Sequence, residues 1–585
     1  MIRLLSIFLL VSLSVVPHAS GGTYWVDDNG VESWANCQGV GPISGASACA
    51  YTTANTNAAA EDTVYFREGT YTISSGNGID PANSGSGHGG SRIVFSAYNS
   101  ESVEFVATHA NGVGVNLNAD NYIKVHGITF TNWYKPLRIM DGDYNEISNC
   151  SFIGCCGGDQ TQGDWVGSRV RSGSMYNHIH DCTFAEYGYF AAADGNDNNV
   201  VFGIGIETST TDDTHYNLIE NCTFRHGGHH VVDFNGYQNI FRNSNIRNDE
   251  WSDYDGTDYG NRLLFTAGDP PDVQRNLFEG NRVGYGRECA DAELGGSGGT
   301  WGSSSHIVRQ NIFFQNYLYG MLVISYSEYN ADNIHIYNNS FWYNGYSPNP
   351  GAIKYLTHAI DIEEDAYASG GVVKNNIFYA NRNKCAGSPG SVVEPDCSTP
   401  DTFTVSDNFD SGDPLFIDIT GVPDPALVAT QFDFGLQSGS TAIDAGSSLT
   451  TVDSVTDGDT VVLVDAGYFF DGWTMVANIP TATIAADQIC FTPTEAVTYN
   501  NCVEIAAINY STNSIDTSTA HGASAGWYVW LHKNSAGDIV LYGTAPDQGA
   551  YKYSEETPAN TIQGVTIGNL KITDYIAYHR EDGLR

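Results

Sequence analysis

The chain has 585 residues, 41% of them hydrophobic and 16% charged, enough for a large core and at least one further domain. Its 67 acidic residues against 25 Lys and Arg give a formal net charge of −42, so nucleic acids and anionic membranes are poor partners. The same acidity fits a saline habitat or bound divalent cations. It disfavours a polyanionic substrate unless a local basic patch or calcium compensates.

Residues 1–20 have the pattern of a secretory signal peptide. The basic start at residues 1–3 is followed by an apolar run from Leu4 to Val16, and the small residues 19–21 offer a cleavage site. This run of 13 residues is too short to span a bilayer, and no other stretch is long enough. We therefore expect a secreted, extracellular monomer without a membrane span.

Residues 21–120 are expected to form an N-terminal cap and the first coils of a repeat. From residue 121 a nine-residue motif recurs, as Tyr-Asn-Leu-Ile-Glu-Asn-Cys-Thr-Phe at 216–224 and in close copies at 144–152 and 176–184. The shortest spacing between copies is 22 residues, so each copy indicates one structural rung, with loops inserted between rungs. The looser copies end at Phe130, Ile246, Val283, Phe313, Phe341 and Phe378.

The columns of the motif define the rung. Five residues before its end the residue is always apolar, and three before its end eight of nine residues are Gly, Asn or Asp, which tolerate a left-handed backbone. Each rung is therefore predicted to hold a strand, a one-residue left-handed corner and a second strand. A further Asn column (Asn145, Asn177, Asn217, Asn239, Asn276) predicts a hydrogen-bonded amide ladder in the interior. The predicted corner residues include Asn149, Asn221, Asn243, Asn338 and Asn375.

The period-2 pattern and the many β-branched and aromatic residues exclude helical solenoids. The prediction is an all-β chain, a right-handed parallel β-helix of ten to twelve rungs. The pattern changes after residue 450, where irregular strands with their own cysteine pair predict a small β-domain at 451–545. The helix and its C-terminal cap are assigned to 121–450, and a closing segment and tail to 546–585.

The repeated motif and three short C-terminal segments resemble those of a known family. The Asn-x-Ile-x-Asn-x-x-Phe rungs are similar to those of the pectate-lyase-like right-handed β-helix superfamily. The pieces at 413–416, 436–446 and 546–551 resemble the closing segment of its secreted bacterial members. The resemblance implies the fold, whereas the fold hosts lyases, hydrolases, epimerases and non-catalytic adhesins.

The cysteines fall into two groups. Three pairs share a separation of twelve residues and lie in loop-like sequence, so local disulfides are expected in an exported chain. Cys150, Cys182 and Cys222 lie in the interior column and are predicted to be buried thiols. The expected disulfide pairs are Cys37–Cys49, Cys385–Cys397 and Cys490–Cys502.

The strand that opens each rung is the expected groove face. The alternating pattern there predicts an inward row and an outward row that is mostly charged. Charged side chains aligned along a β-solenoid suit a saccharide groove, and a solvated face would look the same. The predicted inward row is Ile139, Val170, Ile206, Val232, Leu263, Leu294, Leu322 and Ile360. The predicted outward row is Arg138, Arg169, Arg171, Glu207, His229, Asp233, Arg262, Glu293 and Asp361.

Asp233 is the predicted centre, with His229 four residues earlier and Glu207 and Arg262 on the adjoining rungs as further catalytic candidates. Rungs about 4.8 Å apart would place Glu207 about 5 Å from Asp233, the separation of a retaining glycosidase. A β-eliminating lyase instead needs a base for the proton α to a uronate carboxylate and a cation to neutralise that carboxylate. Arg138, Arg169, Arg171, Glu293, Trp251 and Asp361 are the expected substrate-binding residues.

Two further stretches are rich in metal-ligand residue types. The acidic loop at 249–258 suggests calcium through Asp253, Asp255 and Asp258, sugar stacking through Trp251, or only a solvated loop. The histidines at 226, 229 and 230 fit a groove better than zinc, because they point to alternate faces of a strand. Calcium is the one cofactor expected.

The favoured function is a secreted polysaccharide lyase that cleaves a uronate-containing polymer. The alternatives are a glycoside hydrolase with paired carboxylates and a non-catalytic carbohydrate-binding or adhesion β-helix.

Overall fold

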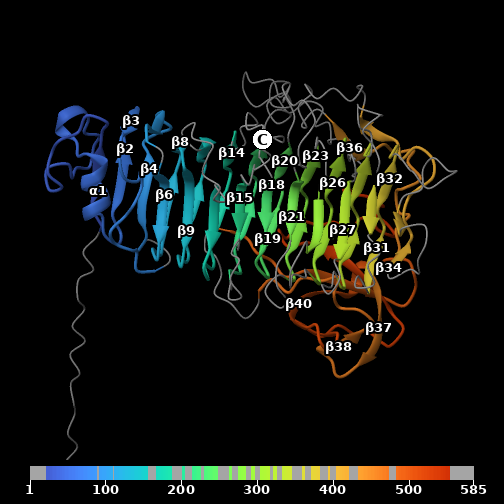
Figure 1. Cartoon of the computed structure of the whole chain (residues 1–585). Helices are drawn as coiled ribbons and strands as arrows, with labels where there is room; N and C mark the ends of the chain where they lie inside the picture. The colour runs from blue at the N-terminus through green and yellow to red at the C-terminus, as the bar shows by residue number, and fades with distance from the viewer. Residues whose placement is uncertain are drawn as a thin grey trace, which may run out of the picture.

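The computed structural model shows a long solenoid of three parallel sheets with a small barrel against one side (Figure 1). It describes residues 21–87, 91–109, 111–155, 167–186, 200–204, 214–225, 230–247, 262–266, 274–284, 292–296, 304–316, 320–325, 332–344, 359–362, 370–381, 393–395, 403–419, 432–473 and 482–553.

Sheet A has thirteen strands, all paired in parallel. Its strands hold the apolar residue five before the end of each motif, and these residues form a buried inward row from Phe95 to Val373. Its strands, in spatial order, are β1 (Thr23–Val26), β2 (Thr63–Phe66), β4 (Ile93–Ala97), β7 (Ile123–His126), β10 (Glu146–Ser148), β13 (His178–His180), β16 (Leu218–Glu220), β19 (Ile240–Arg242), β22 (Leu277–Glu279), β25 (Ile307–Arg309), β28 (His335–Tyr337), β31 (Gly371–Lys374) and β34 (Phe403–Ser406).

Sheet B follows sheet A in each rung and holds the motif's final apolar residue. Phe130, Phe152, Phe184 and Phe224 stack in a row with ring centroids 4.8–5.2 Å apart, close to the spacing between strands. Its strands are β3 (Gly69–Ile73), β5 (Val103–Ala107), β8 (Thr129–Trp133), β11 (Ser151–Cys155), β14 (Thr183–Ala185), β17 (Thr223–Arg225), β20 (Asn245–Arg247), β23 (Arg282–Gly284), β26 (Ile312–Phe314), β29 (Ser340–Trp342) and β32 (Ile377–Tyr379).

Sheet C has ten strands and closes the rung, so ten rungs carry all three strands, within the predicted ten to twelve. Parallel strands joined by crossovers of this kind are right-handed, and the chain is a right-handed parallel β-helix as predicted. Its strands are β6 (Val113–Asn118), β9 (Lys135–Met140), β12 (Ser168–Arg171), β15 (Val200–Ile204), β18 (His230–Phe234), β21 (Arg262–Thr266), β24 (Ala292–Gly296), β27 (Met321–Ser325), β30 (Ile360–Ile362) and β33 (Val393–Pro395).

The corner between sheets A and B is the predicted left-handed residue in every rung. Asn149, Asn221, Asn243, Asn338 and Asn375 have φ of 50–55°, which confirms the prediction. A second left-handed column lies before sheet A, at the tyrosine that opens the motif. Tyr122, Tyr144, Tyr176 and Tyr216 have φ of 55–60° and their rings stack along the solenoid.

Two amide ladders run through the interior beside these corners. In the predicted ladder, each Asn Oδ1 accepts the backbone N–H of the preceding rung, from Asn145 to Asn276. A second ladder follows the corner itself, through Asn281, Asn311, Asn339 and Asn376. Its earlier rungs carry Cys150, Cys182 and Cys222, which are buried free thiols as predicted.

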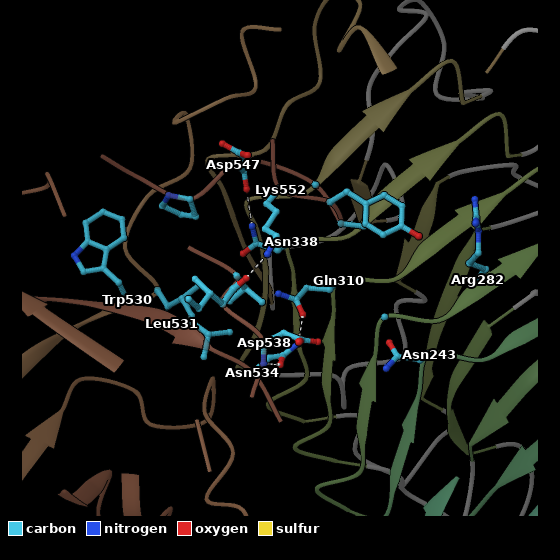
Figure 2. Close-up of a pocket in the computed structure, with 18 of the residues that line it drawn as sticks. Asn243, Arg282, Gln310, Asn338, Trp530, Leu531, Asn534, Asp538, Asp547 and Lys552 are labelled. Carbon is cyan, nitrogen blue, oxygen red and sulfur yellow. Dashed lines mark hydrogen bonds between the residues drawn. The ribbon is translucent and has the colours of Figure 1, made fainter. Parts of the chain in front are cut away.

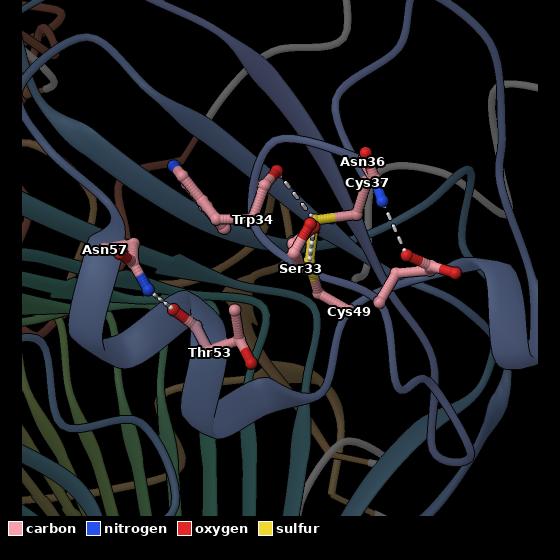
Figure 3. Close-up of a disulfide and its surroundings, with 8 residues drawn as sticks. Ser33, Trp34, Asn36, Cys37, Cys49, Thr53 and Asn57 are labelled. Carbon is pink, nitrogen blue, oxygen red and sulfur yellow. Dashed lines mark hydrogen bonds between the residues drawn. A yellow bond between two sulfur atoms is a disulfide. The ribbon is translucent and has the colours of Figure 1, made fainter.

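A cap closes the N-terminal end of the solenoid. The short helices η1 (Gly45–Ser47) and α1 (Tyr51–Asn57) precede β2, and Ala54 and Ala58 enter the main core. The predicted Cys37–Cys49 disulfide joins the loop that lies beside α1 (Figure 3).

The closing pieces of the solenoid come together at its other end. The antiparallel strands β35 (Phe416–Asp418) and β36 (Asp433–Leu436) contribute to an aromatic cluster with Phe314 and Trp342 of sheet B. Farther along, the backbone N–H of Gly446 donates to Pro546 O at 2.8 Å, and Gly549 N–H donates to Asn375 O at 2.9 Å. The 436–446 and 546–551 segments, which resemble one closing segment, are therefore adjacent.

A closed antiparallel barrel lies between these two pieces in the chain. It packs on the outward face of sheet A, below the C-terminal half of the solenoid in Figure 1. Leu218, Ile240, Leu277 and Ile307 of sheet A form one buried cluster with the barrel's own apolar residues. The barrel strands are β37 (Thr450–Val455), β38 (Thr460–Leu463), β39 (Gln488–Thr492), β40 (Cys502–Asn509), β41 (Ser514–Thr517) and β42 (Tyr528–Lys533), with η4 (Tyr499–Asn501) before β40.

The barrel contains the predicted Cys490–Cys502 disulfide. The third predicted pair, Cys385–Cys397, lies outside the described residues. A search of the described residues for a helix long and apolar enough to cross a membrane found none.

Candidate active site on sheet C

The outward face of sheet C carries a long row of residues that the strand register aligns. Neighbouring positions in this row are paired directly, so successive residues lie about 4.8 Å apart along the solenoid. The row is Asn116, Arg138, Arg169, Gly203, Asp233, Phe265, Glu293, Leu322, Asp361 and Glu394. It contains five residues of the predicted groove, namely Arg138, Arg169, Asp233, Glu293 and Asp361.

The N-terminal part of this row is basic. Arg138 and Arg169 are direct partners on β9 and β12, and Arg171 pairs with Met140 two positions along. Together with Lys135, these side chains line a small depression. Burial, and then the nearby charge of Arg171, lower the pKa of Arg138. In a chain of net charge −42, this is a local concentration of positive charge.

Asp233 is the buried carboxylate of the row. It is 1% exposed, and its neighbours Val232 and Phe234 on β18 belong to the main core. It lies two rungs from Arg169, about 10 Å at the backbone, with Gly203 at the position between them. Because glycine has no side chain, no β-carbon of the intervening rung separates the basic positions from the carboxylate.

The register corrects two of the predicted neighbours of Asp233. Gly203, not Glu207, is its partner on the preceding rung, and Phe265, not Arg262, is its partner on the next. Arg262 instead pairs with His230. Glu207 and His229 lie outside the described residues, as does the side chain of Arg262. The predicted separation of about 5 Å assumed that Glu207 pairs with Asp233, and Gly203 occupies that position instead.

Two members of the predicted inward row are also corrected. Leu264, not Leu263, is level with Val232, and Leu322 belongs to the outward row. The inward residues of β27 are Met321 and Val323, which are buried in the core. Both strands are apolar on both faces, so alternation could not set their phase, and a one-residue slip exchanges the faces. Ile206 lies outside the described residues.

The remaining predicted site residues are only partly placed. Glu293 and Asp361 occupy the outward row by backbone register, and their side chains lie outside the described part of the structure. The loop residues Trp251, Asp253, Asp255 and Asp258 lie outside it altogether. The suggested calcium site therefore stays a prediction. In the described ranges, the one group with metal-ligand spacing is Cys490, Cys502 and His532, and its two sulfurs are joined in a disulfide.

A charged network on sheet A was missed by the sequence reasoning. Glu146 Oε1 lies 2.7 Å from Lys124 Nζ and 3.5 Å from His180 Nε2, and Glu146 Oε2 lies 3.3 Å from Arg92. On the neighbouring rungs, Glu220 contacts His178 at 2.9 Å. The charged residues at the ends of the motif's first strand, on either side of its apolar residue, could have indicated this network.

The pKa values of this network follow from its contacts. Burial opposes ionisation of Glu146, but hydrogen bonds from His180 and Lys124 and the charge of Arg92 lower its pKa to about 2. Burial is likewise outweighed at Glu220, where His178 and Arg242 lower the pKa to about 2. These are the values of a fixed ion network rather than of a proton-transfer group at neutral pH.

The chain is thus a right-handed parallel β-helix, the fold implied by the resemblance to the pectate-lyase-like superfamily. No protein-family model and no curated protein matches the sequence. Similar solved structures include pectate lyase Pel9A, at 15% identity over 74% of this chain and 93% of that one, with a TM-score of 0.45. A rhamnogalacturonan lyase matches at 15% identity over 72% and 97%, with a TM-score of 0.43.

A polysaccharide lyase of family PL6, Pedsa3628 from Pseudopedobacter saltans, matches at 13% identity over 66% of this chain and 97% of that one, with a TM-score of 0.36. Because these TM-scores lie below 0.5, the assignment of the fold rests on the strand order and register described above.

Proposed function

We propose that the chain is a secreted polysaccharide lyase that cleaves a uronate-containing polymer by β-elimination on the outward face of sheet C. The observation that carries this proposal is the pairing of Arg138 with Arg169 on adjacent strands, beside Lys135 and Arg171. A polyanionic chain needs such a patch to approach a protein with a net charge of −42. The two disulfides support export.

In this reaction a base removes the proton on the carbon α to the uronate carboxylate. The electron pair forms a carbon–carbon double bond as the bond from the β-carbon to the glycosidic oxygen breaks, and that oxygen takes up a proton. An arginine against the carboxylate would stabilise the charge that develops on it. Arg169, which is 9% exposed, and Arg138 are the proposed neutralising groups.

A glycoside hydrolase is the second candidate, and the outward row offers four carboxylate positions for it: Asp233, Glu293, Asp361 and Glu394. Asp233 and Glu293 lie two rungs apart, about 10 Å at the backbone, near the upper end of the separation in inverting enzymes. A non-catalytic carbohydrate-binding β-helix is the third.

The test is incubation of the protein with a panel of uronate polymers and neutral polysaccharides, with and without a calcium chelator. A new ultraviolet absorbance from an unsaturated uronate supports the lyase. Reducing ends without that absorbance would identify a hydrolase, and binding without products an adhesin. Loss of activity with the chelator alone, restored by added calcium, would add calcium as a cofactor.

A further inference from the structure

A second cavity lies away from sheet C, between the barrel and the solenoid. Its volume is about 370 Å³, within the range of small-molecule sites. Four parts of the chain line it: the corners between sheets A and B with the first residues of sheet B, the 447–449 segment before the barrel, the barrel from β42 to Val540, and the closing segment at 546–552. Among the described residues, none of the proposed lyase site lines it.

The corner residues of four successive rungs form one wall. Asn243, Gly280, Gln310 and Asn338 line the cavity, and all four have a left-handed backbone, with φ of 52–68°. Three rung spacings of about 4.8 Å make this wall about 14 Å long, which suits a short chain molecule better than a single ring.

The opposite walls bring polar groups toward these corners. Figure 2 shows Asp538, Lys552 and Asp547 gathered around Gln310 and Asn338, with Trp530 at one end and Arg282 at the other. Asn534 Nδ2 donates to Gln310 Oε1 at 3.2 Å, and Asn338 Nδ2 donates to Asp547 O at 2.8 Å. These bonds fix the amides that span the boundary between barrel and solenoid.

The lining combines buried apolar side chains with polar and aromatic groups at the surface. Leu449, Trp530 and Leu531 are buried, whereas Asp538 and Tyr551 are exposed at the rim, Tyr551 by 37%. This combination suits a saccharide, whose C–H faces pack on apolar and aromatic groups while its hydroxyls bond to amides and carboxylates.

Two residues of the lining each carry a buried polar atom with unused hydrogen-bonding capacity. Within the described part of the chain, Asn245 Oδ1 and Arg282 Nε are inaccessible to solvent and have no hydrogen-bond partner. They belong to direct partners on β20 and β23. Arg282 is held in place by Nη2, which donates to Phe432 O at 2.6 Å, and by the ring of Phe434. Such atoms are costly to bury unless a ligand or water satisfies them.

A cation is a poorer occupant of this cavity. Both carboxylate oxygens of Asp547 accept backbone N–H groups, from Asp444 and Tyr553, and burial raises the pKa of this carboxyl. Lys552 and Arg282 add positive charge to the same lining.

We propose that this cavity binds a short stretch of saccharide chain, as a non-catalytic site distinct from the face of sheet C. The site holds the polymer on the barrel side of the solenoid, and its occupancy does not depend on which reaction sheet C performs.

The test is isothermal titration calorimetry of the full chain carrying Asp233→Asn, so that turnover does not consume the probes. The probes are oligosaccharides of three to four units, covering cello-, manno- and xylo-oligosaccharides and oligomers of galacturonate and mannuronate. Asp538→Ala and Tyr551→Ala should each lower the affinity for a bound probe at least tenfold. Asp453→Ala, an exposed change on β37 outside the cavity, should leave it unchanged.

The neutral and uronate probes distinguish the two kinds of saccharide that share this chemistry, and binding of either supports the site. Absence of binding by every probe would overturn the proposal, and so would binding that Arg138→Ala abolishes while Asp538→Ala and Tyr551→Ala leave it intact. If the unmodified protein shows no lyase activity while binding at the cavity is intact, only the proposed function of sheet C is overturned.

Discussion

Arg309 of β25 donates to both carboxylate oxygens of Asp487, at 2.7 and 2.8 Å, across the boundary between solenoid and barrel. Both side chains are fully buried. Arg309 Nε also donates to Glu279 Oε2 at 2.6 Å, and its Nη1 lies 3.0 Å from the Tyr337 hydroxyl. The two parts of the molecule are therefore joined by a closed polar network within an apolar contact. Because hydrogen bonds are directional, this network fixes the relative position of the two parts, in addition to the apolar surface that they bury.

Removing one partner of this pair should be strongly destabilising. Asp487→Ala leaves the guanidinium of Arg309 buried with one carboxylate fewer, and we expect a loss of about 3–5 kcal/mol in the free energy of unfolding. Urea unfolding followed by tryptophan fluorescence measures it, with the exposed Asp453→Ala as a control that should change the stability by less than about 0.5 kcal/mol. Equal stabilities of the two variants would show that the barrel does not depend on this pair.

The sheet A network predicts a loss of stability in acid. The folded pKa values of Glu146 and Glu220 are about 2, below the ordinary 4.5, so the folded state binds fewer protons than the unfolded chain. This contribution, at most about 3 kcal/mol for each carboxylate, is fully present above pH 4.5 and is lost as the pH falls toward 2.

Glu146→Gln should therefore lower the melting temperature at pH 7, and its difference from the unmodified protein should shrink at pH 3. Glu504→Gln, an exposed change in the barrel, should show no such convergence. A constant difference between pH 7 and pH 3 would contradict the assignment.

Replacing a single Asn of the amide ladder should cause a large loss of stability. Asn339 Oδ1 accepts from both the backbone N–H and the side-chain amide of Asn311, at 2.9 and 3.0 Å. Asn339→Ala leaves that buried N–H without an acceptor, so we expect a loss of about 2–3 kcal/mol in unfolding free energy. Asn149→Gly, at an exposed corner with φ 50°, is the matched control and should be nearly neutral.

Turnover should depend on both Arg169 and Asp233 of the sheet C row. Arg169→Ala should lower kcat about 10²–10³-fold through loss of charge stabilisation, with partial recovery in Arg169→Lys. Asp233→Asn should remove activity. Circular dichroism would confirm that each variant folds, and Arg67→Ala, which breaks a pair with Glu101 near the N-terminus, should keep near-normal activity. If Arg169→Ala and Asp233→Asn both turn over normally, the active site lies on another face.

The fold could be predicted because its constraints repeat. A left-handed corner recurs in all nine motif copies and a buried ladder Asn in eight of them, so single exceptions such as Gln310 do not hide the pattern. The residue that opens the motif is left-handed in all nine copies, but this was missed because the position holds Tyr in four copies and varied residues in the others, and Tyr is uncommon in that conformation.

The site was less predictable because the strands of sheet C do not follow the motif at a fixed number of residues. Loops of unequal length precede each of its strands, so Glu207 and Arg262 were aligned by alternation alone, and the register places Gly203 and Phe265 beside Asp233. The contact of Arg309 with Asp487 joins residues 178 positions apart, and the barrel has no repeat that could point to it.

The hydrogen bond between Gly446 N–H and Pro546 O places the entry and exit of the barrel next to each other. A module attached in this way can be gained or lost in a single insertion or deletion without shifting the register of any rung. Loss of the barrel would expose a row of apolar side chains that it now covers, namely Leu218, Ile240, Leu277 and Ile307. A solenoid of this kind without the barrel would therefore be expected to carry polar residues in that row.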